Sequence, residues 1–387
     1  MSNMTTINIE TSEDINKKLD TLLSIAEECV SKDELYDLIK SGKTMVFYDG
    51  FEPSGRIHIA QGILRAINVN KITSIGNTKF IFYVADLFAQ LNHKLGSDIN
   101  KIREAGKLMI ETWRAVGMNM ENVEFIWASE EIAKRPTDYL KLLVDVSTKF
   151  SIGRIKKCAP ALGRDDIDNS DVNGLGNPDF IYDENGKPER VKSDEQTLST
   201  LLYSAMQVSD IPFLKVDIAS LGMDQRKILV INRELAQKNK QKHPPILLMH
   251  HMLLGLDGSK MSKSNPDNAI FMDDSANDVK RKINKAHCPE KDLSNNPITE
   301  LVRYIIFPAQ NKIEIFRDEK YGGNLEFTNI SDFEKAYTEG QIFPLDLKIN
   351  VIRIINSLLE PVRQYFKNNP ELMKLAEKVK SYQSKKN

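Results

Sequence analysis

The sequence has little of what marks several protein classes. Its net charge is near zero, because 53 Lys and Arg residues stand against 54 Asp and Glu residues in a chain of 387. That balance excludes a protein that works by bulk positive charge, although it leaves room for a local patch that binds nucleic acid. Every apolar run is too short or too interrupted to cross a bilayer, so we expect no membrane segment.

Cysteine is also scarce. Cys29, Cys158 and Cys288 lie far apart in the sequence and form no CxxC or CxxH pair. This spacing excludes a disulfide framework and a zinc site, so we expect neutral, buried thiols and no protein-bound metal. The first fifteen residues are acidic and contain no apolar run, which matches neither a secretory signal nor a transit peptide. We therefore expect a cytoplasmic protein.

The sequence does contain enough apolar residues for a substantial core. Hydrophobic residues make up 41% of the chain and charged residues 28%, a balance typical of globular proteins. The length suggests two or three domains. We expect an N-terminal helical segment over residues 1–43, with one helix from Asp14 to Ile39, because the apolar side chains there share one broad face.

Strands and helices alternate after this segment. Short apolar runs predict strands at 44–48, 79–85 and 123–127, and the intervening segments predict helices at 58–71 and 98–116. Strands that alternate with helices of this length indicate parallel βαβ units with right-handed crossovers. The sequence therefore predicts an α/β domain with a parallel sheet.

An insertion interrupts the alternation at about 122–200. Within it, residues 165–190 are rich in Asp, Asn, Gly and Pro, which predicts a long exposed loop. Beyond the insertion, the patterns predict helices at 198–206 and 224–236 and strands at 213–219 and 246–254.

The last third of the sequence is mostly helical. Helical periodicity is clear at 276–286, 298–305 and 345–366. We therefore place a boundary at residue 270, between an α/β domain over 44–270 and a helical domain over 271–387.

The most informative segment joins the first strand of the α/β domain to its first helix. It reads Gly50-Phe51-Glu52-Pro53-Ser54-Gly55-Arg56-Ile57-His58-Ile59-Ala60-Gln61-Gly62. In an open α/β sheet this corner lies at the carboxyl end of a strand, where ligands bind. Gly50 and Gly55 permit a close approach to the backbone, and the helix N-terminus offers N–H groups to a phosphate. His58 falls in the first helical turn, although a histidine there is more often a cap or packing residue.

A second informative segment follows the last strand of the α/β domain. It reads Gly258-Ser259-Lys260-Met261-Ser262-Lys263-Ser264. Lys260 and Lys263 are mobile point charges on a flexible loop and suit the oxygens of a polyphosphate. Taken alone, two lysines at this spacing more often belong to a solvated surface loop.

Together these segments resemble the paired signatures of the class I aminoacyl-tRNA synthetases. The tetrad HIAQ, from His58 to Gln61, is a degenerate form of the family's HIGH signature, and KMSKS, from Lys260 to Ser264, matches the second signature in full. The resemblance extends from residue 44 to 366. It implies a Rossmann-like parallel-sheet catalytic domain and a C-terminal helical anticodon-binding domain. It also implies that ATP is a substrate and brings Mg²⁺ with it.

Further segments are similar to the tyrosyl-tRNA synthetases of the archaeal and eukaryotic type. These are Tyr48 at the end of the first strand, the series Tyr203, Gln207 and Asp210, and the run Gly222-Met223-Asp224-Gln225-Arg226-Lys227. The spacing of Tyr203, Gln207 and Asp210 places the three side chains on one face of a helix. The resemblance implies that Tyr48 and Asp210 flank the phenol hydroxyl of a bound tyrosine. It implies that Tyr203, Gln207 and Gln225 hold the ammonium group.

The resemblance also implies the nucleotide-binding residues. Catalysis is implied for His58, Lys260 and Lys263, and binding of the ribose for Asp224. The full set of residues implied to contact ATP is Gly50, Gly55, His58, Gln61, Gly222, Asp224, Lys260, Met261, Ser262 and Lys263. Gln61 stands where the HIGH tetrad ends in a histidine and carries no charge, so we assign catalysis mainly to His58. Asp86, after the second strand, is implied to lie near tyrosine, with a strand-end cap as an equal alternative.

The expected partners follow from the same resemblance. Arg226 and Lys227 are implied to meet the acceptor end of tRNA, and Phe343 and Asp346 to contact the anticodon. A homodimer is implied through the region 122–157. The function implied as a whole is activation of L-tyrosine by ATP and transfer of tyrosine to tRNA(Tyr).

Three other interpretations stay open at this point. A tryptophanyl-tRNA synthetase has the same fold, but Tyr48 with Asp210 favours a phenol over an indole. A nucleotidyltransferase for a small metabolite would need neither KMSKS nor a helical tRNA-binding half. A binding protein without activity is disfavoured by the intact His58, Lys260 and Lys263.

Overall fold

The computed structural model describes most of the chain. The described residues are 11–158, 180–182, 188–190, 198–259, 261 and 265–384. None of the helices in this part of the chain is long and apolar enough to cross a membrane.

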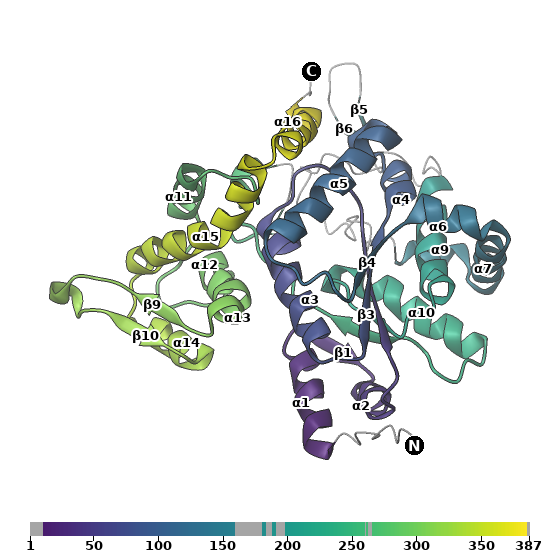
Figure 1. Cartoon of the computed structure of the whole chain (residues 1–387), viewed down its shortest axis with the longest axis horizontal. Helices are drawn as coiled ribbons and strands as arrows, with labels where there is room; N and C mark the ends of the chain where they lie inside the picture. Colours follow the sequence, from purple (N-terminus) through teal and green to yellow (C-terminus); the bar gives the residue numbers. More distant parts are fainter. Residues whose placement is uncertain are drawn as a thin grey trace, which may run out of the picture.

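A six-stranded sheet forms the centre of the molecule, with the strand order β1-β8-β7-β2-β3-β4 (Figure 1). Five strands run parallel, and β1 pairs antiparallel with β8 at one edge. The strands are β1 (Glu28–Val30), β2 (Met45–Phe51), β3 (Thr78–Val84), β4 (Val123–Trp127), β7 (Ile218–Ala219) and β8 (Ile246–Met249). The predicted α/β class with a mainly parallel sheet is therefore confirmed.

Alternate residues of the central strands enter two separate apolar cores. Phe47, Phe80 and Phe82 lie in the core on one face of the sheet, whereas Tyr48 and Tyr83 lie in the core on the other. This division follows from the two-residue repeat of a strand, which sends successive side chains to opposite faces. It brings the hydroxyl-bearing rings of two neighbouring strands to the same face.

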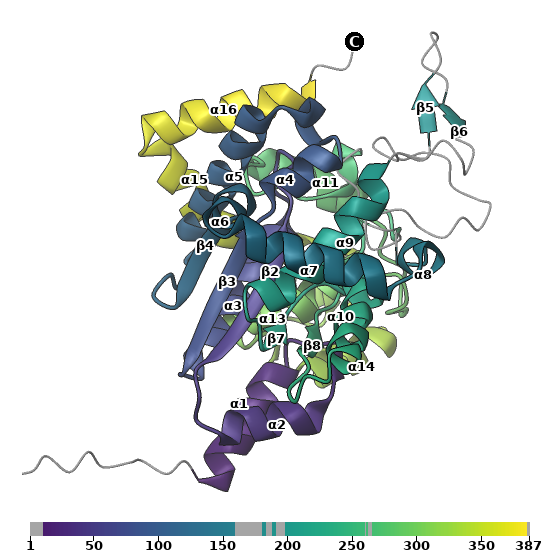
Figure 2. The same cartoon turned by 90° about the vertical axis from the view of Figure 1, so that its right-hand side faces the viewer.

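Helices cover both faces of the sheet, as Figure 2 shows. Beside the first core lie α3 (Arg65–Ser74), preceded by a π-helical turn over Ala60–Leu64, and α5 (Ile99–Ala115). The helices that belong to the second core or flank it are α4 (Asp86–Leu91), α6 (Ala128–Lys134), α7 (Pro136–Lys149), α8 (Ile152–Lys156), α9 (Leu198–Phe213) and α10 (Arg226–Lys238). The predicted loop at 165–190 lies mostly outside the described residues, but β5 (Phe180–Tyr182) and β6 (Pro188–Arg190) pair as a short antiparallel hairpin.

The single N-terminal helix expected from Asp14 to Ile39 is wrong. The segment forms α1 (Ser12–Leu23), then β1, then α2 (Lys32–Lys40). The helical pattern is broken because the backbone of β1 pairs with β8, more than 200 residues away, and because Ser31 adopts a left-handed conformation with φ of 73°. Such a distant backbone partner leaves no mark on local periodicity.

Two strands near the site are shorter than expected. The strand predicted at 213–219 is formed only by Ile218 and Ala219, since α9 continues to Phe213. The strand predicted at 246–254 ends at Met249. In both places a short apolar run fits a buried strand and a buried helix or loop equally well, so the sequence pattern alone does not separate them.

The C-terminal region is mainly helical, as expected, and packs beside the sheet (Figure 1). Its elements are α11 (Ala276–Lys285), α12 (Pro297–Leu301), α13 (Phe307–Gln310), α14 (Ile330–Thr338), α15 (Pro344–Lys367), α16 (Pro370–Ser384), and the two strands β9 (Ile313–Ile315) and β10 (Leu325–Phe327). Its apolar side chains are continuous with the first core of the sheet. The domain boundary at residue 270 stays a prediction.

Candidate functional site

A buried cluster of hydroxyl groups surrounds Asp210 on the second face of the sheet. The hydroxyl of Tyr139 donates a hydrogen bond to Asp210 Oδ1 at 2.9 Å. The other oxygen, Oδ2, and the hydroxyl of Tyr83 are neighbours, and both are buried without a well-aligned hydrogen bond among the described residues. Tyr48, only 2% exposed, packs against Tyr83 with ring centroids 6.0 Å apart. The structure therefore brings the two predicted residues Tyr48 and Asp210 together.

Burial controls the titration of this cluster. It raises the pKa of Asp210 well above the ordinary value for an aspartate, and the nearby hydroxyls of Tyr139 and Tyr83 oppose that shift only in part. Burial, together with the negative charge of Asp210, also raises the pKa of Tyr48 well above its ordinary value. A buried acceptor that lacks a donor is costly. The cluster is thus suited to a ligand that presents a hydroxyl.

A second polar group lies nearer the start of α9, the helix that carries Asp210. Gln207 Nε2 donates to Gln225 Oε1 at 2.9 Å, while Gln207 Oε1 is buried without a hydrogen-bond partner in the described part of the chain. The Tyr203 hydroxyl donates to Glu52, whose carboxylate also accepts from Asn92 Nδ2 at 3.1 and 3.0 Å. Amide and carboxylate oxygens gathered at one place suit a small ammonium group.

Four residues of these two groups were missed by the sequence analysis. Glu52 was visible in the turn after the first strand, where a carboxylate beside two glycines is a usable signal. Tyr83 was visible as the one hydroxyl in the apolar run KFIFYVA. Tyr139 and Asn92 gave no local signal, because their contacts are with residues 71 and 40 positions away.

The HIAQ segment and the segment that follows KMSKS meet through backbone hydrogen bonds. The amide of Ile59 donates to the carbonyl of Ile270 at 2.8 Å, and the amide of Met272 donates to the carbonyl of Ile57 at 2.8 Å. His58 lies between these two bonds, so its backbone is fixed against the segment that follows KMSKS. Two distant parts of the sequence therefore converge on His58.

The base of the KMSKS segment is held by Asn268. This side chain is 4% exposed, and its Oδ1 accepts from the amide of Asp257 at 2.9 Å. A Cβ atom on Gly255 would lie 2.3 Å from Asn268 Nδ2, so only glycine fits there. Met261 packs against the first core. The predicted residues Lys260, Ser262 and Lys263 lie outside the described residues.

The predicted ribose-binding corner lies where β7 and β8 end. Gly222 pairs with His250, and a Cβ atom on Gly222 would lie 2.6 Å from Asp224 Oδ1. Asp224 Oδ2 accepts from Gln225 Nε2 at 3.2 Å, which joins this corner to the pair of Gln225 and Gln207 described above. The close approach explains why glycine precedes Met223 and Asp224.

A buried ion pair lies beneath this corner. Asp49 pairs with Arg65, whose Nη2 also donates to the carbonyl of Ser220 at 3.0 Å. Burial raises the pKa of Asp49 to about 6, although the Arg65 charge opposes the shift. The pair ties β2, α3 and the end of β7 together below the site.

The glycines and Gln61 also have defined places. Gly55 has a φ of 112°, which favours glycine. A Cβ atom on Gly50 would lie 2.5 Å from the Tyr48 hydroxyl. The carbonyl of Gln61 accepts from Trp113 Nε1 at 2.7 Å, and its Oε1 is buried with no hydrogen-bond partner in the described ranges.

Asp86 lies at the carboxyl end of β3, where α4 begins, and its predicted place near the substrate stays a prediction. It is fully buried, and its carboxylate accepts from the amide of Leu87 at 2.9 Å and from the amide and hydroxyl of Ser129 at 2.9 and 2.6 Å. These bonds occupy both oxygens and join the ends of β3 and β4. The contacts favour the alternative of a strand-end cap.

The residues predicted to bind tRNA lie apart from one another. Arg226 lies beside the ribose-binding corner and forms an ion pair with Glu28 of β1, with Nε to Oε2 at 2.6 Å. Phe343, 51% exposed, precedes α15, and Asp346 lies in the first turn of that helix. The predicted tRNA-binding residues therefore fall into two groups, one beside β1 and one at the start of α15.

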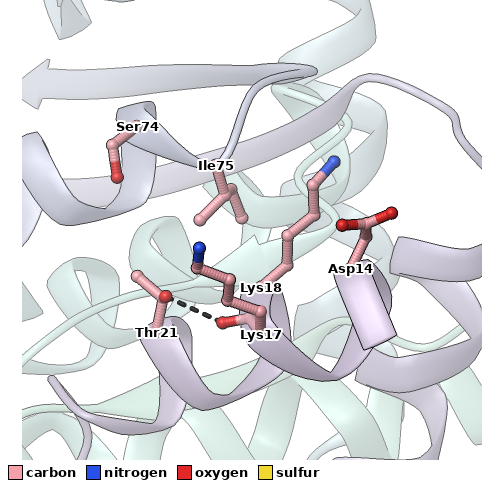
Figure 3. Close-up of a pocket in the computed structure, with 6 residues that line it drawn as sticks. All are labelled: Asp14, Lys17, Lys18, Thr21, Ser74 and Ile75. Atoms are coloured by element: carbon pink, nitrogen blue, oxygen red, sulfur yellow. Dashed lines mark hydrogen bonds between the residues drawn. The ribbon is translucent and has the colours of Figure 1, made fainter. Parts of the chain in front are cut away.

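An open hollow on the surface lies elsewhere. A depression of about 310 Å³ lies between α1 and the end of α3. Figure 3 draws the residues that line it, Asp14, Lys17, Lys18, Thr21, Ser74 and Ile75. Ser74 and Ile75 come just before β3 begins, so the hollow lies toward the amino ends of the strands. Ligands of open α/β sheets bind at the opposite edge. No group of three metal-ligating side chains occurs in the part of the chain that the structure describes.

Comparison with known proteins identifies the family. The family model of the class I tRNA synthetases (W and Y) matches residues 40–360. The chain is 40% identical over 373 residues to the cytoplasmic tyrosine–tRNA ligase 1 of Arabidopsis thaliana, covering 96% of this chain and 90% of that protein.

Solved structures agree with this assignment. The Leishmania major tyrosyl-tRNA synthetase bound to tyrosinol superimposes with a TM-score of 0.82 at 37% identity, over 96% of this chain but only 53% of that one. The Pyrococcus horikoshii tyrosyl-tRNA synthetase bound to L-tyrosine gives a TM-score of 0.80 at 30% identity, over 94% of this chain and 99% of that one. The chain therefore belongs to the class I tRNA synthetases of the tryptophan and tyrosine group and, within it, to the tyrosyl-tRNA synthetases, the ligases that charge tRNA with tyrosine.

Proposed function

We propose that this chain activates L-tyrosine with ATP and transfers it to tRNA(Tyr), with both steps at the carboxyl edge of the sheet. One observation supports this most strongly. Asp210 Oδ2 and Gln207 Oε1 are buried acceptors on α9 with no hydrogen-bond partner among the described residues. One suits a hydroxyl donor and the other an ammonium donor, and tyrosine carries both at opposite ends of the molecule, the hydroxyl on its ring and the ammonium on its α-carbon.

The phenol end of the substrate is assigned to Asp210 and Tyr48. The substrate hydroxyl donates to Asp210 Oδ2 and accepts from the hydroxyl of Tyr48. The ammonium end is assigned to Gln207, Tyr203 and Gln225, with Glu52 supplying the negative charge that partners it. A phenylalanine would leave Asp210 and Tyr48 unpaired, and the loss of such buried hydrogen bonds gives strong discrimination.

The first chemical step is assigned to the groups around the triphosphate. A carboxylate oxygen of tyrosine attacks the α-phosphorus of ATP in line, the bond to the bridging oxygen breaks, and pyrophosphate leaves. Charge develops on phosphate oxygens, so positioned cations and N–H donors lower the barrier most. We assign His58, Lys260 and Lys263 to these oxygens and Asp224 to the ribose hydroxyls. Mg²⁺ enters as the ATP complex.

The second step needs the acceptor end of tRNA. A ribose hydroxyl of the terminal adenosine attacks the tyrosyl carbonyl carbon, and AMP leaves. We assign Arg226 and Lys227 to the acceptor stem, because they follow Gln225 and lie beside the ribose-binding corner. Arg226 would exchange its ion pair with Glu28 for a contact to tRNA.

Exchange of pyrophosphate into ATP tests the proposed first step. We expect wild-type protein to catalyse this exchange with tyrosine and not with phenylalanine or tryptophan, because only tyrosine pairs with both Asp210 and Gln207. The assay measures labelled pyrophosphate incorporated into ATP for each amino acid in turn. Exchange that depends on tryptophan would contradict the tyrosine pocket. Absence of exchange with all three would contradict activation itself.

Asp346→Ala tests the anticodon assignment. We expect charging of tRNA(Tyr) to weaken by roughly 10- to 100-fold, the range that one lost bidentate base contact gives, with pyrophosphate exchange unchanged. The side chain lies at the start of α15, far along the chain from the tyrosine pocket. The matched control is Asp332→Ala, in the first turn of α14. Equal loss in charging and exchange would contradict a role in the anticodon contact.

A homodimer and a cytoplasmic location complete the proposal. On α7, Leu140 and Val144 are 59% and 53% exposed, and Ile152 of α8 is 62% exposed. An apolar face at this position suits a second copy of the chain, in the region 122–157 where the resemblance implies the interface. Sedimentation measures the oligomeric state directly. The location follows the cytoplasmic Arabidopsis relative.

A further inference from the structure

Arg56 lies two residues before His58, and three residues hold its guanidinium group. Its Nε donates to Asp273 Oδ1 and Oδ2, both at 3.0 Å, and its Nη2 donates to Asp273 Oδ1 at 2.6 Å and to Asp274 Oδ1 at 3.0 Å. Its Cζ atom lies 4.0 Å from the centroid of the Phe271 ring. The Arg56 side chain is only 15% exposed, so solvent screens these contacts weakly.

Asp274 extends this contact into the C-terminal helices. Its Oδ2 accepts from the amide of Phe271 at 2.9 Å and from Lys282 Nζ at 2.6 Å, and its carbonyl accepts from Arg363 Nε at 3.0 Å. Asp274 and Lys282 are 3% and 4% exposed. Arg56, Asp274 and Lys282 thus form a buried row of alternating charges. The row joins the turn of His58 to α11 and α15.

The row lies beside the backbone hydrogen bonds that flank His58. Ile57 and Ile59 pair with Met272 and Ile270, so the place of His58 depends on where the segment 270–272 lies. Arg56 binds Asp273 and Asp274, the two residues directly after that segment. The planar guanidinium group fits a carboxylate in a way that a lysine ammonium does not.

We propose that Arg56 is a positioning residue for His58, holding the turn of the HIAQ signature against Asp273 and Asp274 so that the imidazole meets the triphosphate. The proposal rests on the proposed function, because it takes His58 to act on phosphate oxygens. Arg56 itself touches no substrate. Its effect is on the rate of activation and not on the pocket for tyrosine.

Arg56→Ala is the main test. We expect kcat of tyrosine-dependent pyrophosphate exchange to fall roughly 10- to 100-fold, as misplacement of a catalytic group by about 1 Å does, with KM for tyrosine within about twofold of wild type. The matched control is Arg233→Ala. Arg233 is also 15% exposed and pairs with Glu34 at 2.9 and 3.0 Å, but it lies on α10 away from His58. The control is expected to keep kcat within about twofold, since a lost ion pair alone does not slow chemistry.

Combination with His58→Ala separates positioning from general damage. If Arg56 acts through His58, the double variant is expected to be as slow as His58→Ala alone, within about twofold, because groups that act as one unit are not additive. Asp273→Asn is a milder second variant, since Asp273 is 41% exposed and its replacement leaves no buried charge without a partner. It is expected to lower kcat in the same direction by about 3- to 10-fold. This variant carries the test if Arg56→Ala fails to fold.

Several outcomes would overturn the proposal. The proposal is wrong if both Arg56→Ala and Asp273→Asn keep kcat within threefold of wild type. It is also wrong if Arg233→Ala lowers kcat as much as Arg56→Ala does. If Arg56→Ala lowers kcat by the same factor in the His58→Ala protein as in the wild-type protein, Arg56 acts independently of His58. Wild-type protein without tyrosine-dependent exchange would instead contradict the proposed function, so the two failures are distinct.

Discussion

Asp210→Asn is expected to lower kcat/KM for tyrosine in pyrophosphate exchange by roughly 100- to 1,000-fold, the range for a buried hydrogen-bonding group left without its partner. The asparagine keeps one oxygen for the Tyr139 hydroxyl, which now lies 2.9 Å from Asp210 Oδ1. Its amide then faces the substrate phenol as a second donor beside Tyr48, and the phenol hydrogen loses its acceptor. Because phenylalanine never used that acceptor, the preference for tyrosine over phenylalanine should shrink by a similar factor.

Asp210→Asn is expected to lower activity but not the melting temperature at high pH. Burial raises the pKa of Asp210 in the folded protein above its ordinary value of 3.8, so over the pH range between the two values the folded state binds more protons than the unfolded state. The free energy of unfolding of wild type therefore falls as pH rises through that range, and asparagine removes this fall. At pH 8 the variant should melt at the same temperature as wild type or higher, and this advantage should vanish toward pH 4.

Thermal unfolding from pH 4 to 8, together with exchange kinetics, checks both effects of Asp210→Asn. Ser209→Ala is the matched control, since Ser209 is as buried on α9 as Asp210 but its hydroxyl donates to the carbonyl of Ala205 in the same helix, at 2.9 Å. A tyrosine rate within tenfold of wild type would contradict the assignment of Asp210 to the phenol. A pH profile of melting identical to that of wild type would contradict the raised pKa.

His58→Ala is expected to lower kcat of activation roughly 100-fold, in the range found when one group that stabilises transition-state charge is removed. KM for tyrosine should stay within about threefold, because we assign Tyr48, Gln207 and Asp210 to the amino acid and His58 to the phosphates. The measurement is the exchange rate with tyrosine and ATP varied independently.

Gln61→Ala is the comparison for His58→Ala. Gln61 stands at the end of the same signature but carries no charge, so we expect a smaller loss in kcat than for His58→Ala.

A tenfold rise in KM for tyrosine with unchanged kcat in His58→Ala would place the imidazole in the amino-acid pocket and contradict its assignment to phosphate.

The local pattern of the sequence was sufficient wherever propensity, capping and periodicity agree with the conformation that packing imposes. The helix expected at 98–116 begins after Asp98, whose side chain caps it, and ends at Ala115. The strand expected at 123–127 is present with the same limits. Propensity, capping and periodicity act within a few residues, and a single sequence records them.

Local pattern failed where a distant partner decided the conformation. β1 exists because β8 offers a free edge, and nothing near Glu28 signals that pairing. α9 continues to Phe213, since its second half packs into the core that holds Tyr48 and Tyr139. Asp86 had a cap and a site residue as equal alternatives, and only the tertiary structure shows its bonds to Leu87 and Ser129.

The sequence by itself determined which chemical groups are present, because HIAQ, KMSKS and the series Tyr203, Gln207 and Asp210 are readable by spacing along one helix or loop. Only the tertiary structure decided how those groups are completed. Tyr139 on α7 donates a hydrogen bond to Asp210, and Asn92 at the end of α4 donates one to Glu52. Arg56 donates to Asp273, which lies 217 positions away in the sequence. Such contacts depend on the packing of whole elements, which local spacing does not encode.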